Sequence, residues 1–356
     1  MPSKSLLLIS FVTLAVSVNA ASITPKRATC PDGATTTKNA ACCSFFALAE
    51  DLQKKIFLNE CGEDAHEALR FSFHEAITFS KVLAAQGKFP GGGADGSFLI
   101  FLDVEANFLP ANAGLSDSVD FLLPVLGRHP DITAGYFVQF AGAVAVGNCP
   151  RAPRLQFMAG RLKVTAPGPQ GLIPLPEDSV DNTERTTSTP LSPPLLSIAT
   201  FSHLIPNSSL RHFSRELASP GTANSTSEAA SPLPLTSGDE SGELRLQSDF
   251  ALARDPRTAC TWQNFVNQKQ AMTNAFANAM LKLSVVGVGA SKHIDCSEAM
   301  PVPAAPNGKG ASYPATKSFK DVQQACKAPF PSLPTNLGAT ETVIPHCPAG
   351  ATDCDS

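Results

Sequence analysis

Ten cysteines limit the folds that are open to this chain of 356 residues. An even number of cysteines is typical of a protein that folds in an oxidising compartment, and ten cysteines fit five disulfides. They do not follow the C-x-x-C spacing that is typical of zinc sites. The sequence alone leaves their connectivity open. The ten are Cys30, Cys42, Cys43, Cys61, Cys149, Cys260, Cys296, Cys326, Cys347 and Cys354.

The N-terminal segment indicates the same compartment. Lys4 precedes an apolar run over residues 6–18, which is too short to span a bilayer and is typical of a signal peptide. We expect cleavage after Ala20, so that residues 1–20 are the signal peptide. Residues 21–27 end in a dibasic pair and are interpreted as a propeptide. The sequence therefore predicts a secreted, extracellular protein; the alternative is a buried N-terminal helix.

Composition and charge exclude some partners. Apolar residues make up 43% of the chain, which is enough for a sizeable core, and the net charge is −4. Nucleic-acid binding is not expected, because no broad basic surface is indicated. Beyond the N-terminal run no segment is apolar enough for a membrane span, and no feature indicates an oligomer, so we expect a monomer.

Helical periodicity predicts a mainly α fold. Apolar residues recur at helical spacing over residues 40–86, 131–145 and 257–283, and no convincing strand alternation is present. Asp131 and Thr133 stand where the N-terminal cap of the second stretch is expected. Residues 182–240 differ, because Thr, Ser and Pro dominate them and helical periodicity is absent. A structureless segment of this length is uncommon inside a compact domain. We expect residues 322–356 to form a C-terminal tail.

Arg70 and His74 are the first candidates for chemistry. Their i, i+4 spacing places both side chains on one face of a helix. Neutral His can take a proton from one oxygen of a peroxide and return it to the other, while Arg stabilises the negative charge on the departing oxygen. The pair therefore suits peroxide cleavage, although most pairs with this spacing are surface or structural residues.

Two groups of oxygen donors lie close to this pair in the sequence. Residues 91–97 form a Gly-rich loop whose Asp95 and Ser97 offer oxygens to a hard cation such as Ca²⁺, and Glu75 adds a carboxylate. Glu63 and Glu67 lie one helical turn apart, where like charges repel unless a cation lies between them. The alternatives are a solvated turn and two solvated glutamates.

Several motifs in linked order resemble the secreted class II haem peroxidases of fungi, the family of manganese, versatile and lignin peroxidases. The resemblance covers roughly residues 28–181 and 230–356. It implies a two-domain haem peroxidase fold, with haem between a distal domain at 28–177 and a proximal domain at 178–321. Residues 61–74 resemble the distal haem helix and residues 91–97 the distal calcium loop. Other matching segments are 139–145, 148–150, 152–155, 160–161, 171–174, 246–249 and 253–260.

The resemblance implies roles for the distal residues. His74 is expected to be the acid–base residue, Arg70 the stabiliser of the cleaving peroxide and Phe73 the aromatic residue over the haem. Asn112 is expected to orient His74 through a hydrogen bond, with Glu105 holding Asn112. The implied cofactors are haem b and Ca²⁺, and hydrogen peroxide is the implied oxidising substrate.

The resemblance also assigns the metal sites. Glu63 and Glu67 match the pair that binds Mn²⁺ beside a haem propionate. Glu75 stands where the family has Asp after the distal His, so its side chain is one methylene longer. The expected ligands of the distal calcium are Glu75, Gly93, Asp95 and Ser97.

Further expectations concern the proximal half and the disulfides. Asp249 matches the carboxylate that hydrogen-bonds the proximal His and raises its basicity. Trp262, the single Trp, is interpreted as a core residue, and the alternative is a role in carrying electrons from aromatic substrates. The disulfide pairing that the resemblance implies is Cys30–Cys43, Cys42–Cys296, Cys61–Cys149, Cys260–Cys326 and Cys347–Cys354.

The segment at 182–229 departs from the family pattern. In the family this segment contains the proximal helix with the haem-ligating His, the third Mn²⁺ carboxylate and the second calcium site. These motifs are absent from residues 182–229. His203 is a weak candidate for the axial ligand, since its position is near the expected one but outside any helical pattern. Without an axial His the haem iron lacks the basic ligand that anchors it.

A shifted reading frame is another explanation for this segment. Residues 204–211 can be encoded by bases that, read one position along, encode Phe-Asp-Thr-Gln-Phe-Phe-Val-Glu, which resembles the family at this place. On this hypothesis a misplaced splice junction or a base error removed part of the proximal helix. A continuous transcript that encodes residues 204–211 as written would exclude the shift.

Three functions follow as hypotheses. The first is a secreted haem peroxidase that reduces hydrogen peroxide and oxidises Mn(II), and also small phenolic or lignin-derived aromatic reductants. The second is a generic or versatile peroxidase without a preference for Mn(II). The third is a secreted, catalytically dead relative that has lost its haem ligand.

Overall fold

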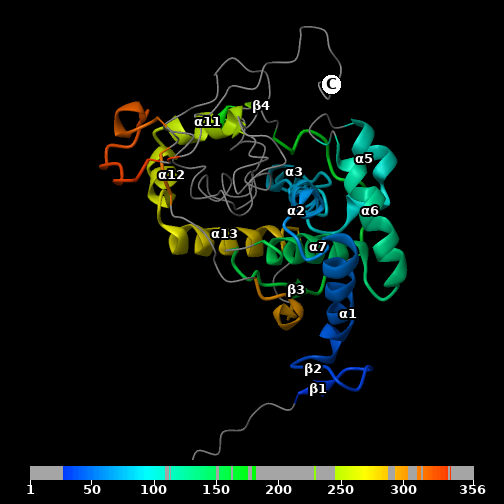
Figure 1. Ribbon diagram of the computed structural model, residues 1–356. Helices are drawn as coiled ribbons and strands as arrows, with labels where there is room; N and C mark the ends of the chain where they lie inside the picture. Colours follow the sequence, from blue (N-terminus) through cyan, green and yellow to red (C-terminus); the bar gives the residue numbers. More distant parts are fainter. Residues whose placement is uncertain are drawn as a thin grey trace, which may run out of the picture.

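A computed structural model of the chain describes residues 27–108, 112, 114–149, 152–161, 163–174, 179–181, 228–229, 245–287, 293–303, 311–313, 316–335 and 337. The fold is mainly helical, as the periodicity predicts. In Figure 1, α11 (Gln247–Arg254) and α12 (Ala259–Phe265) lie on the opposite side from α5 (Leu102–Phe108) and α6 (Leu115–Arg128), and α13 (Lys269–Leu283) runs up to α7 (Ala134–Gly147). No helix among the described residues is long and apolar enough to cross a membrane.

Two helices of equal length, α2 and α7, form the centre of the first half. Helix α2 spans Glu63–Ala76 and α7 spans Ala134–Gly147. Every residue of α7 except Tyr136 is buried, so α7 is a core helix on all sides. A Cβ at Gly142 would lie 2.4 Å from Ser72 Oγ, so only glycine allows α2 to approach this closely. The α2–α7 contact fixes the position of the helix that carries the candidate site.

The start of α7 agrees with its sequence. Thr133 is the N-cap, and its hydroxyl accepts a hydrogen bond from the Tyr136 backbone N–H. Such a cap satisfies one of the backbone donors that the first helical turn leaves unpaired. The cap expected from the sequence is therefore confirmed.

Helices α1 and α6 pack around this pair. Helix α1 spans Cys43–Asp51 and continues into a π-helical turn, η2, at Leu52–Ile56. Phe45 of α1 packs edge-on against Phe157 and in a tilted contact against Phe140 of α7. Helix α6, which spans Leu115–Arg128 and contains Pro124, was not expected from the sequence.

The second half differs from the sequence prediction in one respect. The stretch 257–283 is not one helix but two, α12 at Ala259–Phe265 and α13 at Lys269–Leu283. Asn267 between them has a φ of 56°, in the left-handed region that Asn tolerates better than most residues, and this conformation interrupts the helix. Trp262 of α12 is 2% exposed and is a core residue, as expected.

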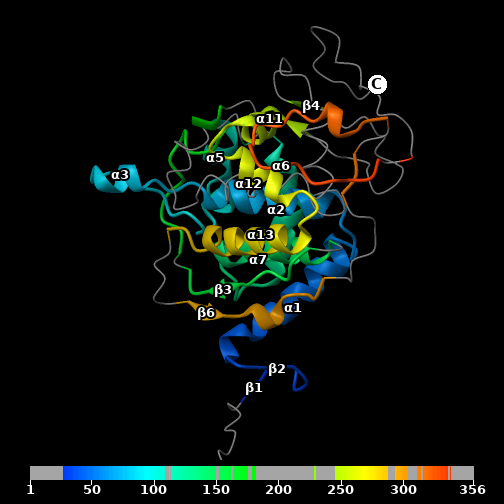
Figure 2. The same cartoon turned by 90° about the vertical axis from the view of Figure 1, so that its left-hand side faces the viewer.

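The remaining elements are short. Within the described residues, three two-residue antiparallel pairs are formed by β1 with β2, β3 with β6 and β4 with β5. Helix α3 projects from the body of the molecule in Figure 2. The bounds are β1 Ala28–Thr29, β2 Thr36–Thr37, β3 Met158–Ala159, β4 Glu228–Ala229, β5 Arg245–Leu246, β6 Ile294–Asp295, η1 Ala40–Cys42, α3 Lys81–Ala85, α4 Ser97–Ile100, α5 Leu102–Phe108, α11 Gln247–Arg254, η6 Ser297–Ala299 and η7 Phe319–Asp321.

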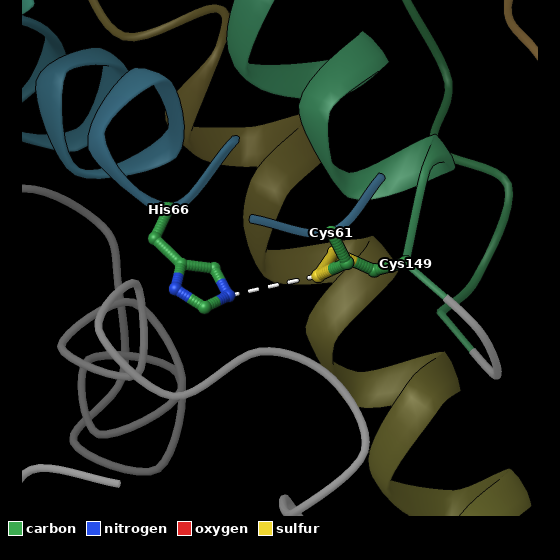
Figure 3. Close-up of side chains that lie close together, drawn as sticks. All are labelled: Cys61, His66 and Cys149. Carbon is green, nitrogen blue, oxygen red and sulfur yellow. Dashed lines mark hydrogen bonds between the residues drawn. A yellow bond between two sulfur atoms is a disulfide. The ribbon is translucent and has the colours of Figure 1, made fainter. Parts of the chain in front are cut away.

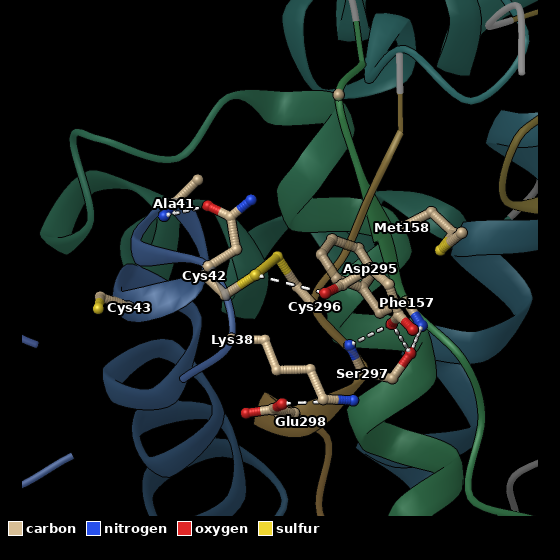
Figure 4. Close-up of a disulfide and its surroundings, with 12 residues drawn as sticks. Lys38, Ala41, Cys42, Cys43, Phe157, Met158, Asp295, Cys296, Ser297 and Glu298 are labelled. Carbon is tan, nitrogen blue, oxygen red and sulfur yellow. Dashed lines mark hydrogen bonds and ion pairs between the residues drawn. A yellow bond between two sulfur atoms is a disulfide. The ribbon is translucent and has the colours of Figure 1, made fainter. Parts of the chain in front are cut away.

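Four disulfides tie these elements together. The bond between Cys42 and Cys296 joins the start of α1 to the segment after β6, and next to it the Phe157 N–H donates to the Ser297 hydroxyl (Figure 4). All four pairs are among those that the resemblance implies, and the fifth, Cys347–Cys354, lies outside the described residues. The four are Cys30–Cys43, Cys42–Cys296, Cys61–Cys149 and Cys260–Cys326.

Candidate active site

A hydrogen-bonded relay surrounds His74 on α2. His74 is 7% exposed, and its Nδ1 lies 3.0 Å from Asn112 Oδ1. Asn112 Nδ2 in turn donates to the backbone carbonyl of Glu105 at 3.1 Å. Because the amide nitrogen donates to that carbonyl, Asn112 Oδ1 accepts a hydrogen bond from the Nδ1–H of His74, and the lone pair of the neutral imidazole is then on Nε2. The relay fixes both the tautomer and the orientation of His74.

This geometry refines one sequence-based expectation. Glu105 does hold Asn112, but through its main-chain oxygen and not through its carboxylate. The carboxylate points elsewhere, and its Oε1 accepts from the Gly168 N–H at 2.9 Å. The backbone carbonyl of Glu105 thus contacts Asn112, whereas its side chain contacts the backbone of Gly168.

Arg70 and Phe73 share helix α2 with His74. The Arg70 side chain is 15% exposed, and its Nη1 lies 3.9 Å from Glu67 Oε1. The Phe73 side chain is buried, and its ring packs edge-on against the His74 imidazole with centroids 5.6 Å apart. A permanent cation, an oriented imidazole and an aromatic ring are therefore brought together within two turns of one helix.

A cluster of buried carboxylates lies beside this helix. Glu75, Asp95 and Glu105 are all buried. Glu75 accepts hydrogen bonds from the Gly96 N–H and from Gln139 Nε2 of α7, the second at 3.0 Å. Asp95 Oδ1 accepts from the Ser97 N–H at 3.1 Å. The loop at 91–97 is thereby attached to both α2 and α7.

Burial makes it unfavourable for the three carboxyl groups of this cluster to be ionised together without a cation. Burial raises the pKa of Glu75 to about 8, and the charge of Asp95 adds to this rise. Burial raises the pKa of Asp95 and of Glu105 too. Ser97 Oγ and Glu105 Oε2 are buried and make no hydrogen bond within the described part of the chain. Converging carboxylates with orphaned oxygens fit a hard cation such as Ca²⁺.

The loop backbone also suits a cation site. Gly93 has a φ of 68°, and a Cβ there would lie 2.4 Å from the Val286 carbonyl oxygen. Only glycine fits this position, for both reasons. The Ala94 N–H donates to the same Val286 carbonyl at 3.0 Å, so the turn after α13 supports the loop.

Glu63 and Glu67 differ in their surroundings. Glu63 is exposed at the start of α2, whereas Glu67 is partly buried and its Oε2 accepts from the Ser118 hydroxyl at 2.8 Å. Ser118 belongs to α6 and was not foreseen from the sequence, because the contact joins residues 51 positions apart. The two carboxylates lie one helical turn apart, as expected.

A neighbouring group of potential metal ligands is a disulfide with a histidine beside it. Figure 3 shows His66 Nε2 pointing at Cys61 Sγ, at 3.6 Å, with Cys149 on the far side of the sulfur–sulfur bond. The ligand atoms of all three lie within 4.8 Å of one another. Both sulfurs are bonded to each other and are not thiolates, so this group is a structural cross-link and not a metal site.

Several expected residues cannot be placed. His203 lies outside the described residues, as do Cys347 and Cys354. Asp249 lies within α11, and its side chain is not described. Gln139 lies in the segment 139–145 that resembles the family, but its hydrogen bond to Glu75 is seen only in the structure.

Comparison with known proteins agrees with this site. Residues 48–192 match the peroxidase family, and residues 271–348 match the fungal peroxidase extension region. Manganese peroxidase H4 of Phanerodontia chrysosporium is 46% identical over 98% of this chain and 96% of its own length. Manganese peroxidase 2 of Phlebia radiata is 44% identical over 98% of this chain and 94% of its own. Versatile peroxidase VPS1 of Pleurotus eryngii is 42% identical over 91% and 92%.

The helical fold and the His–Arg site therefore define a peroxidase, an oxidoreductase that acts on hydrogen peroxide. The chain belongs to the class II peroxidases of fungi. This is a haem-binding, calcium-binding family, and the mainly α fold expected from the sequence is confirmed.

Proposed function

We propose that this chain is a secreted, monomeric peroxidase that oxidises Mn(II) at the expense of hydrogen peroxide. The observation that carries the choice of Mn(II) is the pair Glu63 and Glu67 on the same helix as the peroxide-cleaving residues, with Glu67 3.9 Å from Arg70. The names of two relatives at 44–46% identity support it. Secretion is supported by the apolar N-terminal run at 6–18 and by the four disulfides.

The described residues fit the distal face of a haem. A bound haem would supply an iron that binds the peroxide and takes up its two oxidising equivalents. Arg70 and Phe73 would line its pocket, while the His that would hold the iron, for which His203 is the candidate, lies outside the described residues. The buried His74, already oriented by Asn112, is the group that such a site needs beside a bound peroxide.

The distal residues move one proton. His74 Nε2 would accept the proton of one peroxide oxygen, and the imidazolium would then give this proton to the second, outer oxygen. With both hydrogens on it, the outer oxygen would leave as water when the bond between the oxygens breaks, and the haem would take up the first oxygen with its two oxidising equivalents. Arg70 would donate hydrogen bonds to the outer oxygen while negative charge develops on it, and Asn112 would keep the imidazole oriented throughout.

The substrate cation would bind at the edge of this site. Glu63 is exposed and Glu67 partly buried, so Mn(II) can reach the pair from solvent and still lie close to the distal helix. Carboxylate oxygens are the donors that Mn(II) prefers. A third carboxylate and a haem propionate, if they complete this site as the resemblance implies, come from outside the described residues.

Calcium is proposed to bind Glu75, Asp95, Ser97 and the carbonyl of Gly93. We expect calcium-free protein, prepared on a chelating resin, to melt roughly 5–10 °C lower at pH 7, since saturating ligand typically stabilises by ~3 kcal/mol.

This lowering of the melting temperature should depend on pH. The folded calcium-free chain holds the Glu75 proton up to a pKa of about 8, while the unfolded chain releases it near 4.5. The contribution of Glu75 to the stability of the calcium-free chain is thus fully present below pH 4.5 and is lost as the pH rises to 8.

Thermal melts from pH 4.5 to 8 measure this effect, with Glu75→Gln as the matched variant. Calcium-free Glu75→Gln should lose much of the pH dependence, because the titrating group is gone. A calcium-free wild type whose melting temperature is flat across this window would contradict the placement of Glu75 in a buried anionic cluster.

The second candidate function is a peroxidase without Mn(II) preference that acts on phenolic or other small aromatic reductants. The 42% identity to a versatile peroxidase supports this second candidate. Trp262 gives it no support, since this Trp is 2% exposed. Turnover of a phenol that is unaffected by Mn(II), together with no Mn(III) formation, would select this alternative. Absence of haem uptake would select the catalytically dead relative.

A further inference from the structure

Ser118 makes the one hydrogen bond that is described between α6 and the carboxylate of Glu67. Its side chain is fully buried, and its hydroxyl donates to Glu67 Oε2 at 2.8 Å. The position of Ser118 is fixed by its helix, because Leu115, Val119 and Leu122 on the same stretch are buried in the core. Ser118 is therefore a donor held rigidly against one oxygen of Glu67.

The other oxygen of Glu67 faces the catalytic arginine. Oε1 lies 3.9 Å from Arg70 Nη1, three residues along the same helix. This distance is at the outer limit of an ion pair and is too long for a direct hydrogen bond. The start of α6 also lies against this arginine, since a Cβ on Gly114 would be 3.5 Å from Arg70 Nη1. Glu67 thus lies between a neutral donor on α6 and a cation that the peroxide reaction needs.

We propose that Ser118 is a positioning residue for Glu67, which it holds away from a close ion pair with Arg70. This inference rests on the proposed Mn(II) function. Held by Ser118, the carboxylate keeps one oxygen for the substrate cation, and the Arg70 guanidinium is not drawn into a close pair with it. Without the hydroxyl, Glu67 closes on Arg70 in a bidentate pair. Mn(II) must then compete with an internal cation, and the arginine is drawn from the distal face.

Mn(II) binding to the purified full-length protein, in excess calcium, is the direct test. Loss of the electron paramagnetic resonance signal of free aqueous Mn(II) measures the bound fraction. Ser118→Ala should weaken binding about tenfold, as expected for loss of a hydrogen bond to a charged group. Ser118→Thr retains the hydroxyl and should bind nearly as the wild type does. Ser116→Ala, on the exposed side of the same helix, is the matched control and should be unchanged.

A double variant separates positioning from a general loss of structure. If Ser118 acts through Glu67, then Ser118→Ala should have no further effect on Mn(II) binding in a Glu67→Gln background. In the haem-loaded protein, Ser118→Ala should also slow the reaction with peroxide several-fold, because Arg70 is displaced.

The outcomes are distinguishable. Wild-type protein that binds Mn(II) with a Ser118→Ala variant that binds it equally well would overturn the positioning role and leave the proposed function standing. An equal additional loss in the Glu67→Gln background would show a merely structural effect and overturn it too. A wild type that binds no Mn(II) would overturn the proposed function, and the positioning role with it.

Discussion

Replacement of His74 by Ala should lower the rate of reaction with hydrogen peroxide on the order of 10³-fold, within the range of general acid–base catalysis. The reason is that no other imidazole in the described part of the chain is aimed by the Asn112–Glu105 relay. The measurement is stopped-flow absorbance of the haem-loaded protein after mixing with peroxide. Binding of haem and calcium should be unchanged, because His74 belongs to neither proposed ligand set.

The control for His74→Ala is His66→Ala. His66 lies two turns earlier in α2, beside the Cys61–Cys149 disulfide, and should react with peroxide at the wild-type rate. Asn112→Ala should lower the rate with peroxide less than His74→Ala does, because it removes the hydrogen bond that orients the imidazole and leaves the imidazole in place. Equal rates for His74→Ala and the wild type would show that peroxide is cleaved elsewhere.

Replacement of both Glu63 and Glu67 by Gln should lower kcat/KM for Mn(II) on the order of 100-fold or more. Gln keeps the shape of the side chain and removes the charge that attracts and holds the cation, and loss even of groups that only support metal ligands typically lowers metal affinity 10–100-fold. The measurement is the formation of the Mn(III)–malonate complex at varied Mn(II). The rate of oxidation of a small phenol in the absence of Mn(II) should change little.

Glu60→Gln is the matched control for that double variant. Glu60 is an exposed glutamate in the turn just before α2, so its replacement removes one nearby charge without touching the pair. Its kcat/KM for Mn(II) should stay close to that of the wild type. A similar loss in Glu60→Gln would mean that overall charge, and not a binding site, controls Mn(II) oxidation.

Local patterns predicted much of the architecture. The spacing of Arg70 and His74 placed them on one helix, Thr133 marked the start of α7, and the Gly-rich loop at 91–97 lies where its sequence indicates. The disulfide pairing came from the resemblance and agrees with the four bonds described. These features depend on residues close in sequence or on a family pattern that spans the chain.

What sequence reasoning missed depends on tertiary contacts. Helix periodicity continues through Asn267, and only the φ of 56° there reveals the break between α12 and α13. Ser118 and Gln139 gave no local signal, because each acts on a residue of α2 from a different helix. The resemblance implied that Glu105 holds Asn112, but only the structure shows that the Glu105 carbonyl does so while its carboxylate accepts from the Gly168 N–H.

The most direct test of a complete peroxide-cleaving site in this chain is the absorption spectrum of the purified protein after addition of haem, before and after one equivalent of hydrogen peroxide. A Soret band that forms with haem and then shifts within seconds of peroxide addition is expected, and the shift should be slow in His74→Ala. A chain that takes up no haem, or a Soret band that peroxide leaves unchanged, would contradict the assignment of peroxidase chemistry to this protein.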